Sequence, residues 1–413
     1  MTDTLTHRVE PGGRRDRRRR RVLRRRMAWG ALGLIPVLVL AIVALTRSSA
    51  GGGTKPVVRP VGGTLEGGQV TYLLVGTRKG DPTGQADWLT LLAIDRSGRN
   101  PLTLFIPAST LAELPGYGFD SIGKGLPLGR VSLQQVAVEN MLGVAVDHTM
   151  LMPQDLLAKI IDRAGGIDLT VPARLQALNS SGQRVTVFQA GAQHLDGDQA
   201  ARYVAYRGPD EGELGRFVRA QAVWEALYTR FGSRDAGRLA EVFAGLGSDL
   251  ATDAPPADAG ALFAAFSSAG VDARAYLTLP VTAVSTAGPE DAFRVDQAGL
   301  DRLVHERLMG SLPPAGVGRG ARLQILNGNG RPEIGARVAA VVVPAGFRVT
   351  DSGNASSFGF ARTKVIVYRE ADVPIAERIR GLLGLGSIEI SLTPQTIVDV
   401  TIIVGHDYAS RTS

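Results

Sequence analysis

The pattern of hydrophobic and polar positions divides the chain into segments. Residues 27–46 contain no charged side chain and are rich in Leu, Ile, Val and Ala. Twenty residues in a helix span about 30 Å, which matches the hydrocarbon core of a bilayer. The pattern therefore predicts one transmembrane helix over 27–46. Residues 47–68 are Gly-rich and polar, which is typical of a flexible linker.

From residue 69 to residue 308 the pattern alternates between strands and helices. Short apolar runs predict buried strands at 70–76, 88–94, 101–107 and 167–171. Apolar positions at helical spacing predict helices at 132–142, 154–164, 196–206 and 216–231. Asp196 is the N-cap candidate of the third helix, and 236–308 is predicted to be helical with one strand at 276–279. The alternation predicts an α/β domain with a mixed sheet covered by helices.

A second and smaller α/β domain is predicted at 321–409, after a linker rich in Pro and Gly at 309–320. Its expected strands lie at 322–326, 364–368 and 397–404, and its expected helices at 334–343 and 376–383. The turn at 327–330 follows a strand and precedes a helix, as phosphate loops do. It lacks the Lys-Ser/Thr pair of such loops, so we interpret it as a tight turn.

The location of the charge indicates how the chain meets a membrane. Residues 1–26 hold eleven Arg and three acidic residues, a net charge of +8, so the other 387 residues sum to −1 although the whole chain carries +7. A basic tail beside an apolar span predicts that 1–26 is cytoplasmic and the remainder extracytoplasmic. A signal peptide cleaved after the small residues 48–50 is the alternative.

Charge and cysteine content also exclude several classes of function. The excess of positive charge lies in the tail and not in the predicted fold, so we expect no specific binding of nucleic acid. The sequence contains no Cys, which excludes disulfides, thiolate metal sites and cysteine nucleophiles.

A series of short motifs occurs in 69–308. In chain order they are 72–76 (YLLVG), Asp87, 106–107, 142–144, 146–148, 164–167, Gly191, 195–197, Ala200, 203–204, Arg207, 215–216, Arg219 and Gln221. This series resembles the LytR-CpsA-Psr family, which are membrane-anchored enzymes of bacterial cell-envelope assembly. Residues 325–330, 345–347 and 404–407 make 321–409 similar to the LytR_C-type domain often appended to that family.

The resemblance implies a chemistry. Members are thought to transfer a glycopolymer from a polyprenyl pyrophosphate onto peptidoglycan, so the implied partners are the lipid-linked glycopolymer, peptidoglycan and the membrane. Pyrophosphate calls for several Arg, usually with Mg²⁺ held by carboxylates, and the lipid tail calls for an apolar tunnel. The implied pyrophosphate contacts are Arg207, Arg216 and Arg219, with Glu213 at the substrate and Asp87 as the metal ligand.

The sequence departs from the family pattern at four charged positions. Gln85 stands in place of an Arg, Ala108 and Ser109 in place of Arg-Asp, and Ala205 in place of another Arg. We therefore expect the chain to retain binding of the lipid-linked polymer while losing its transfer. We also expect this binding to depend little on Asp87.

Two other readings remain open. One is an active phosphotransferase whose missing cations are replaced by Arg78, Lys79 or Lys124. The other is an envelope-linked transcription regulator. The regulator is disfavoured because the folded part is expected outside the membrane, where there is no chromosome.

Overall fold

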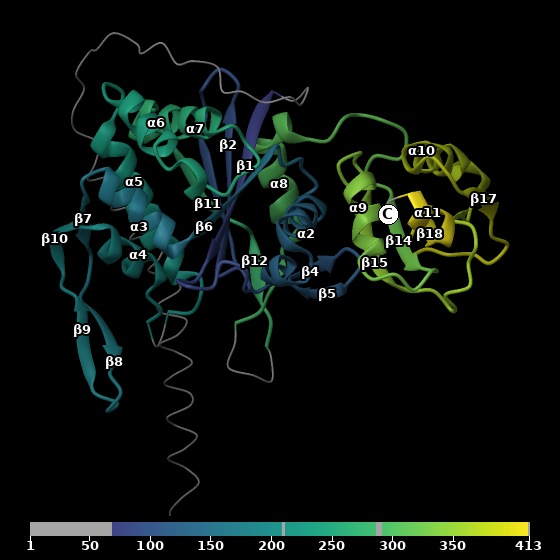
Figure 1. Ribbon diagram of the computed structural model, residues 1–413, viewed down its shortest axis with the longest axis horizontal. Helices are drawn as coiled ribbons and strands as arrows, with labels where there is room; N and C mark the ends of the chain where they lie inside the picture. The colour runs from purple at the N-terminus through teal and green to yellow at the C-terminus, as the bar shows by residue number, and fades with distance from the viewer. Residues whose placement is uncertain (1–67, 209–210, 286–290, 412–413) are drawn as a thin grey trace, which may run out of the picture. The chain divides into compact units, whose positions relative to one another are not determined.

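The computed structural model describes residues 68–208, 211–285 and 291–411 (Figure 1). The expected basic tail, transmembrane helix and almost all of the first linker lie outside these ranges. Within them, no helix is both long enough and apolar enough to span a bilayer.

A mixed five-stranded sheet forms the centre of the first domain, with the strand order β11-β3-β2-β1-β6. Its strands are β1 (Gln69–Thr77), β2 (Trp88–Asp95), β3 (Leu102–Ile106), β6 (His148–Pro153) and β11 (Ala275–Thr278). β1 runs antiparallel to β2 and parallel to β6, and β11 runs parallel to β3. β1 is buried along its whole length, because helices cover both faces of the sheet. The predicted mixed sheet covered by helices is confirmed.

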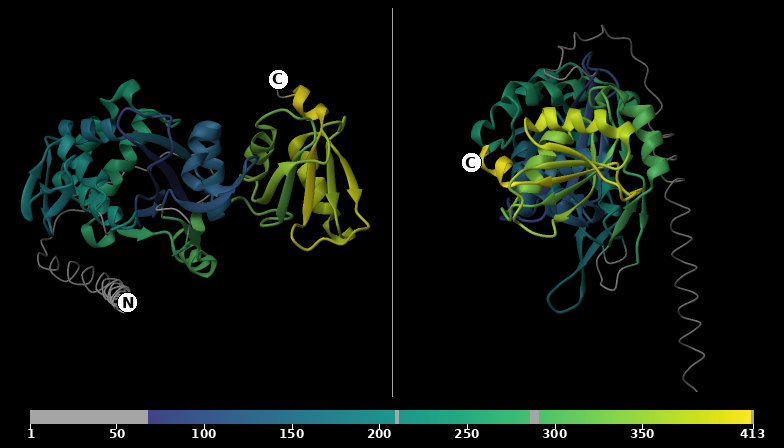
Figure 2. Two further views of the ribbon diagram at one scale, coloured as in Figure 1. Left: turned by 90° about the horizontal axis from the view of Figure 1, so that it is seen from below. Right: turned by 90° about the vertical axis from the view of Figure 1, so that its right-hand side faces the viewer.

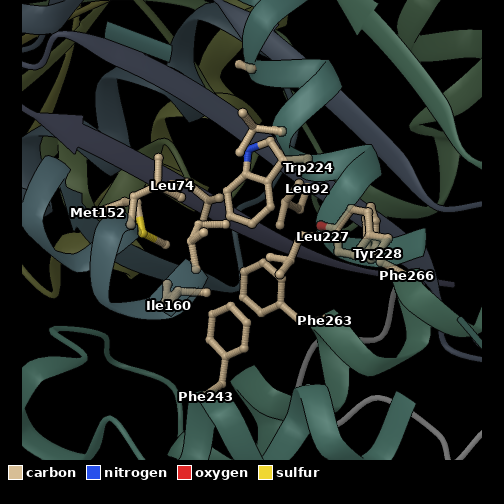
Figure 3. Close-up of a cluster of buried hydrophobic side chains, with 14 of the residues drawn as sticks. Leu74, Leu92, Met152, Ile160, Trp224, Leu227, Tyr228, Phe243, Phe263 and Phe266 are labelled. Atoms are coloured by element: carbon tan, nitrogen blue, oxygen red, sulfur yellow. The ribbon is translucent and has the colours of Figure 1, made fainter. Parts of the chain in front are cut away.

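Alternate residues of β1 point into two separate cores. Tyr72 and Leu74 pack with α3 (Gln154–Arg163), α4 (Gly197–Ala205), α5 (Gly215–Phe231), α6 (Ala236–Ala244) and α7 (Pro256–Ser268). Figure 3 shows part of this core, where aromatic side chains of α5, α6 and α7 meet. Leu73 and Val75 face α2 (Gly125–Leu142) and α8 (Gln297–Arg307).

A second sheet, not predicted from the sequence, lies beside the first with the order β12-β13-β4-β5. Its strands are β4 (Thr110–Leu114), β5 (Gly118–Ser121), β12 (Val281–Ala283) and β13 (Phe293–Val295). Two antiparallel pairs complete the domain. One joins β7 (Ile167–Val171) to β10 (Gly191–Leu195), and the other joins β8 (Leu175–Leu178) to β9 (Arg184–Phe188).

The C-terminal domain has its own sheet with the order β15-β14-β18-β16-β17. The strands are β14 (Arg322–Asn327), β15 (Arg348–Asn354), β16 (Lys364–Val367), β17 (Ser387–Ile390) and β18 (Val400–Val404). Its helices are α9 (Ile334–Val342), α10 (Val373–Leu383) and α11 (His406–Arg411). The predicted α/β class is confirmed, whereas β15 and β17 were not predicted. Two hydrogen bonds join this domain to α2. The side-chain amide of Asn140 donates to the Val349 carbonyl (2.8 Å) and accepts from the Val349 backbone N–H (2.7 Å).

The tight turn predicted at 327–330 is confirmed. Asn327 Oδ1 accepts hydrogen bonds from the amides of Asn329 and Gly330, and the buried Asn329 side chain donates to the carbonyls of Val404 and Gly405. These bonds occupy the groups that a phosphate loop would turn toward its ligand.

Candidate functional site

The candidate site is built where β1 ends and β2 begins. The Asp87 amide donates to the Gly76 carbonyl (2.8 Å), which fixes Asp87 at the edge of the sheet. Gly76 is required there, because a Cβ at this position would lie 1.9 Å from the ring of Trp88. The local sequence thus brings the Asp87 carboxylate to the end of β1 and directs the Trp88 ring across the backbone of Gly76.

Three guanidinium groups surround the Asp87 carboxylate. Arg216 on α5 binds Oδ2 through Nη2 and the Asp87 carbonyl through Nη1 (3.1 Å). Arg207, just after α4, binds Oδ1 at 2.7 Å, and Arg78 approaches the same oxygen at 3.5 Å. The expected residues Arg207 and Arg216 therefore meet at Asp87. Arg78, which the sequence suggested as a replacement cation, joins them.

The electrostatic environment of Asp87 favours its charged form. Burial raises the pKa of this carboxyl group, but the charge and hydrogen bond of Arg216, with the charges of Arg207 and Arg78, outweigh burial and lower it overall. The site therefore holds an ionised carboxylate facing three cations, and it keeps a net positive charge.

The cations differ in their access to solvent. The Arg216 side chain is 3% exposed, and its Nε donates to the Val204 carbonyl (3.4 Å), so this guanidinium is held inside the protein. Arg207 is 51% exposed and Arg78 is 71% exposed. Of the cations at Asp87, Arg207 and Arg78 are the ones that can reach a ligand without rearrangement.

Arg219 lies apart from Asp87 although it shares α5 with Arg216. Its Nη1 donates to Glu211 (2.5 Å) and its Nη2 to the Tyr206 carbonyl (2.6 Å). The guanidinium carbon also lies 5.0 Å from the centre of the Tyr206 ring, a cation–π contact. Its Nε is buried and has no hydrogen-bond partner among the residues that the structure describes. Glu211 and Tyr206 were not identified from the sequence, although Tyr206 directly precedes Arg207.

Glu213 has a structural role in this arrangement. Its carboxylate accepts hydrogen bonds from the Ala108 amide (2.5 Å), from the Ser109 amide (3.3 Å) and from the Ser109 hydroxyl. Glu213 thereby holds the turn after β3, at the two positions where the resemblance led us to note missing charges. The sequence named the three residues but gave no sign that they contact one another.

The carboxylates do not fit a Mg²⁺ site as they are arranged. Both oxygens of Asp87 face Arg side chains, and those of Glu213 accept hydrogen bonds from the turn. In the described parts of the chain, no group of three or more His, Asp or Glu side chains is placed to hold a metal ion. The expected Mg²⁺ therefore stays a prediction without support from this geometry.

The apolar space behind Arg216 is almost filled. A cavity of about 10 Å³ lies among residues of β2, β3 and α5 that include Trp88, Phe105, Phe217 and Trp224. Phe105 stacks on Phe217 at 5.2 Å, and Trp224 stacks on Phe263 at 5.6 Å. Ligand pockets are typically about 300–1,000 Å³. The apolar lining expected for a lipid tunnel is present, but a lipid chain would have to push these rings apart.

The other suggested replacement cations form ion pairs elsewhere. Lys79 approaches Asp198 at 3.4 Å, and Lys124 binds Asp120 at 2.9 Å. Neither pair includes the Asp87 carboxylate. Of the three suggested replacement cations, Arg78 is therefore the one that contacts Asp87.

Comparisons with known proteins agree with the motif order. The family described as LytR_cpsA_psr matches residues 50–307, and the domain described as LytR cell envelope-related transcriptional attenuator matches 320–408. Among solved structures, TagV of B. subtilis superimposes with a TM-score of 0.51 at 20% identity, covering 60% of this chain and 98% of TagV. That likeness concerns the fold.

Two curated relatives match by sequence. The polyisoprenyl-teichoic acid–peptidoglycan teichoic acid transferase TagU of Bacillus mycoides is 29% identical over 161 residues, 38% of this chain. The probable cell wall biosynthesis protein LcpB of Corynebacterium glutamicum is 30% identical over 153 residues, 37% of this chain. The matches span 51% of TagU and 36% of LcpB, so the chain covers about half or less of these relatives.

Proposed function

The chain belongs to the LytR_cpsA_psr family, and we propose that it binds the phosphate groups of a polyprenyl-linked glycopolymer during cell-wall assembly. We place it at the membrane, anchored by residues 27–46 with its domains outside. Transfer of the polymer to peptidoglycan is reduced or lost. The name of the TagU relative, a teichoic acid transferase that uses a polyisoprenyl carrier, supports this class of substrate.

The observation that carries the proposal is the exposed pair Arg207 and Arg78 beside the buried Arg216–Asp87 pair. A guanidinium has five N–H donors, and one hydrogen bond joins Arg207 to Asp87. Its remaining donors suit the oxygens of a phosphate group, which Arg binds in a bidentate manner. Arg216 and Arg219 are buried, so they act as positioning residues and sources of positive potential.

Reduced transfer follows from the way the acidic groups are used. Phosphoryl transfer depends on cations and positioned groups that neutralise charge in the transition state. Ala108 is 5% exposed and uncharged, and Ser109 is bonded to Glu213. Neither position supplies the charge that the family pattern has there.

The binding test uses the full chain in detergent micelles with a short-chain polyprenyl pyrophosphate. Arg207→Ala removes charge-assisted hydrogen bonds, so affinity should fall roughly ten- to hundredfold. Arg302→Ala, at an exposed position on α8, is the matched control and should bind as the wild type does. Unchanged affinity in Arg207→Ala, or the same loss in Arg302→Ala, would contradict the proposal.

An active transferase is the second candidate, favoured by the transferase name of the TagU relative. Transfer of polymer from a polyprenyl pyrophosphate donor to peptidoglycan distinguishes the two. Efficient Mg²⁺-dependent transfer by the wild-type chain would replace the binding role with an enzymatic one. Binding without transfer supports the proposal above.

A further inference from the structure

The hairpin of β8 and β9 stands away from the rest of the first domain. It projects beyond β7 and β10 in Figure 1, and the right-hand view of Figure 2 shows the same hairpin extending from the domain. The hairpin contacts the domain mainly at its base, where Phe188 meets the ring of Tyr203 edge-on (5.2 Å) and the Tyr206 hydroxyl donates to the Gln176 carbonyl (2.7 Å). Because an isolated two-stranded hairpin is at best marginally stable in water, this element is expected to gain contacts from its surroundings.

Both faces of the hairpin carry exposed aliphatic side chains. Leu178 is 59% exposed, Val185 is 40% exposed and Val187 is 43% exposed. Val185 lies opposite Ala177, and Leu178 lies opposite Arg184. Since neighbouring residues of a strand point to opposite faces, Val185 and Leu178 face opposite ways. A single flat protein surface would cover one face, whereas lipid can surround both.

The charge of the hairpin region has one sign. Residues 172–195 contain Arg174 and Arg184, both exposed, and no Asp or Glu. The tip at 179–183 is polar and uncharged. Aliphatic side chains with Arg and without acidic residues are typical of segments that lie at the surface of an anionic bilayer.

We propose that the β8–β9 hairpin contacts the headgroup region of an anionic membrane. The hairpin should lie at shallow depth, because the outer edges of β8 and β9 have no neighbouring strand in the described residues and unpaired backbone groups need water. The orientation of the domain that this contact implies, with Arg207 toward the membrane, rests on the proposed function. Tyr206 binds the hairpin and directly precedes Arg207, so membrane contact would hold Arg207 near a lipid phosphate.

The test uses the absence of Cys from the chain. Val185→Cys and Leu178→Cys variants of the full chain are labelled with an environment-sensitive fluorophore and reconstituted in vesicles containing phosphatidylglycerol. Val271→Cys is the matched control, since Val271 is 49% exposed on the same domain. We expect a nitroxide near the lipid headgroups to quench the labels at 178 and 185 more strongly than the label at 271.

Two outcomes would overturn the proposal. Equal quenching at 185 and 271 would place the hairpin away from the bilayer. Self-quenching between labels at 185 with no effect of the lipid nitroxide would instead show that a second copy of the chain covers the hairpin.

A charge-reversal variant provides the second measurement. Arg174→Glu with Arg184→Glu should weaken the contact with phosphatidylglycerol vesicles, by roughly fivefold or more, and should abolish the difference between anionic and neutral vesicles. Undiminished quenching at 185 in this variant would contradict the charge argument. Binding of polyprenyl pyrophosphate in micelles should stay unchanged, so failure of the hairpin proposal is separable from failure of the proposed function.

Discussion

Asp87 is the residue on which the candidate site depends. It pairs with Arg216, which is 3% exposed, and removal of one partner of a buried ion pair costs about 3–5 kcal/mol. We predict that Asp87→Asn lowers the free energy of unfolding by about that amount in urea titrations. Arg207→Ala breaks a pair whose cation is 51% exposed, so its cost should stay below about 1 kcal/mol. Similar costs for both variants would contradict the role of Asp87.

The same residue shows what the sequence could and could not predict. The resemblance to the LytR-CpsA-Psr family implied that Asp87, Arg207 and Arg216 belong to one site, and the structure brings them together. The contact of Glu213 with Ala108 and Ser109 was not predictable, because these residues are far apart in the sequence. The separations are 105 positions for Ala108 and 104 positions for Ser109. Side-chain partners at such separation depend on the tertiary fold, which no local pattern encodes. The expectation that Asp87 matters little for ligand binding stays a prediction, and the large effect on stability is a separate one.

At the scale of elements, α4 illustrates a prediction that local sequence supports. Asp196 accepts a hydrogen bond from the Gln199 amide, and the Gln199 side chain accepts one from the Asp196 amide, which completes a capping box. Asp196→Ala should cost about 0.5–2 kcal/mol of unfolding free energy. Asp196→Ser preserves a capping oxygen, so it should retain most of the stability. Equal losses in the two variants would show that the cap contributes little.

Long elements were easier to predict than very short strands for a physical reason. α3, α4 and α5 present long amphipathic patterns, and their predicted bounds agree with the structure within about one residue. β12 and β13 are three residues each, and together they contain one buried residue, Phe293. So short a segment shows no clear period, and β13 pairs with β4, a strand far away along the chain. The second sheet was missed for this reason.

At the scale of the whole molecule, a half-buried carboxyl group joins the two domains. Glu113 on β4 accepts a hydrogen bond from the Ser352 hydroxyl on β15. Burial raises the pKa of Glu113 to about 7, the Ser352 hydrogen bond opposes the shift, and the charge of Asp351 adds to it. Burial likewise raises the pKa of Glu139 to about 7.

These pKa values predict how stability changes with pH. The folded state keeps both protons up to about pH 7, whereas the unfolded state releases them near the ordinary value of 4.5. The contribution of these two groups to stability is therefore complete below pH 4.5 and is lost as the pH rises toward 7. Glu113→Gln should reduce this loss, as measured by urea midpoints at several pH values. Glu306→Gln, an exposed control on α8, should not. A wild-type stability that rises through this window would contradict the prediction.

Topology is the other prediction at this scale. The basic tail and the uncharged span at 27–46 predict that the domains lie outside the cell. A reporter that works only outside the cytoplasm, fused after residue 60, should be active. A reporter that works only in the cytoplasm should be silent at the same position. Cytoplasmic activity there would contradict the membrane placement in the proposed function.

The Asp87 cluster has a further consequence for ligand binding, because the protein already supplies an anion to its own cations. A phosphate that took the place of the carboxylate at Arg207 would exchange one negative group for another. The net gain would be the difference between two ion pairs, and few additional counterions would be released to the solution. Such exchange predicts an affinity that changes less with salt than the number of Arg side chains suggests. It also predicts tighter phosphate binding when acid neutralises the competing carboxylate.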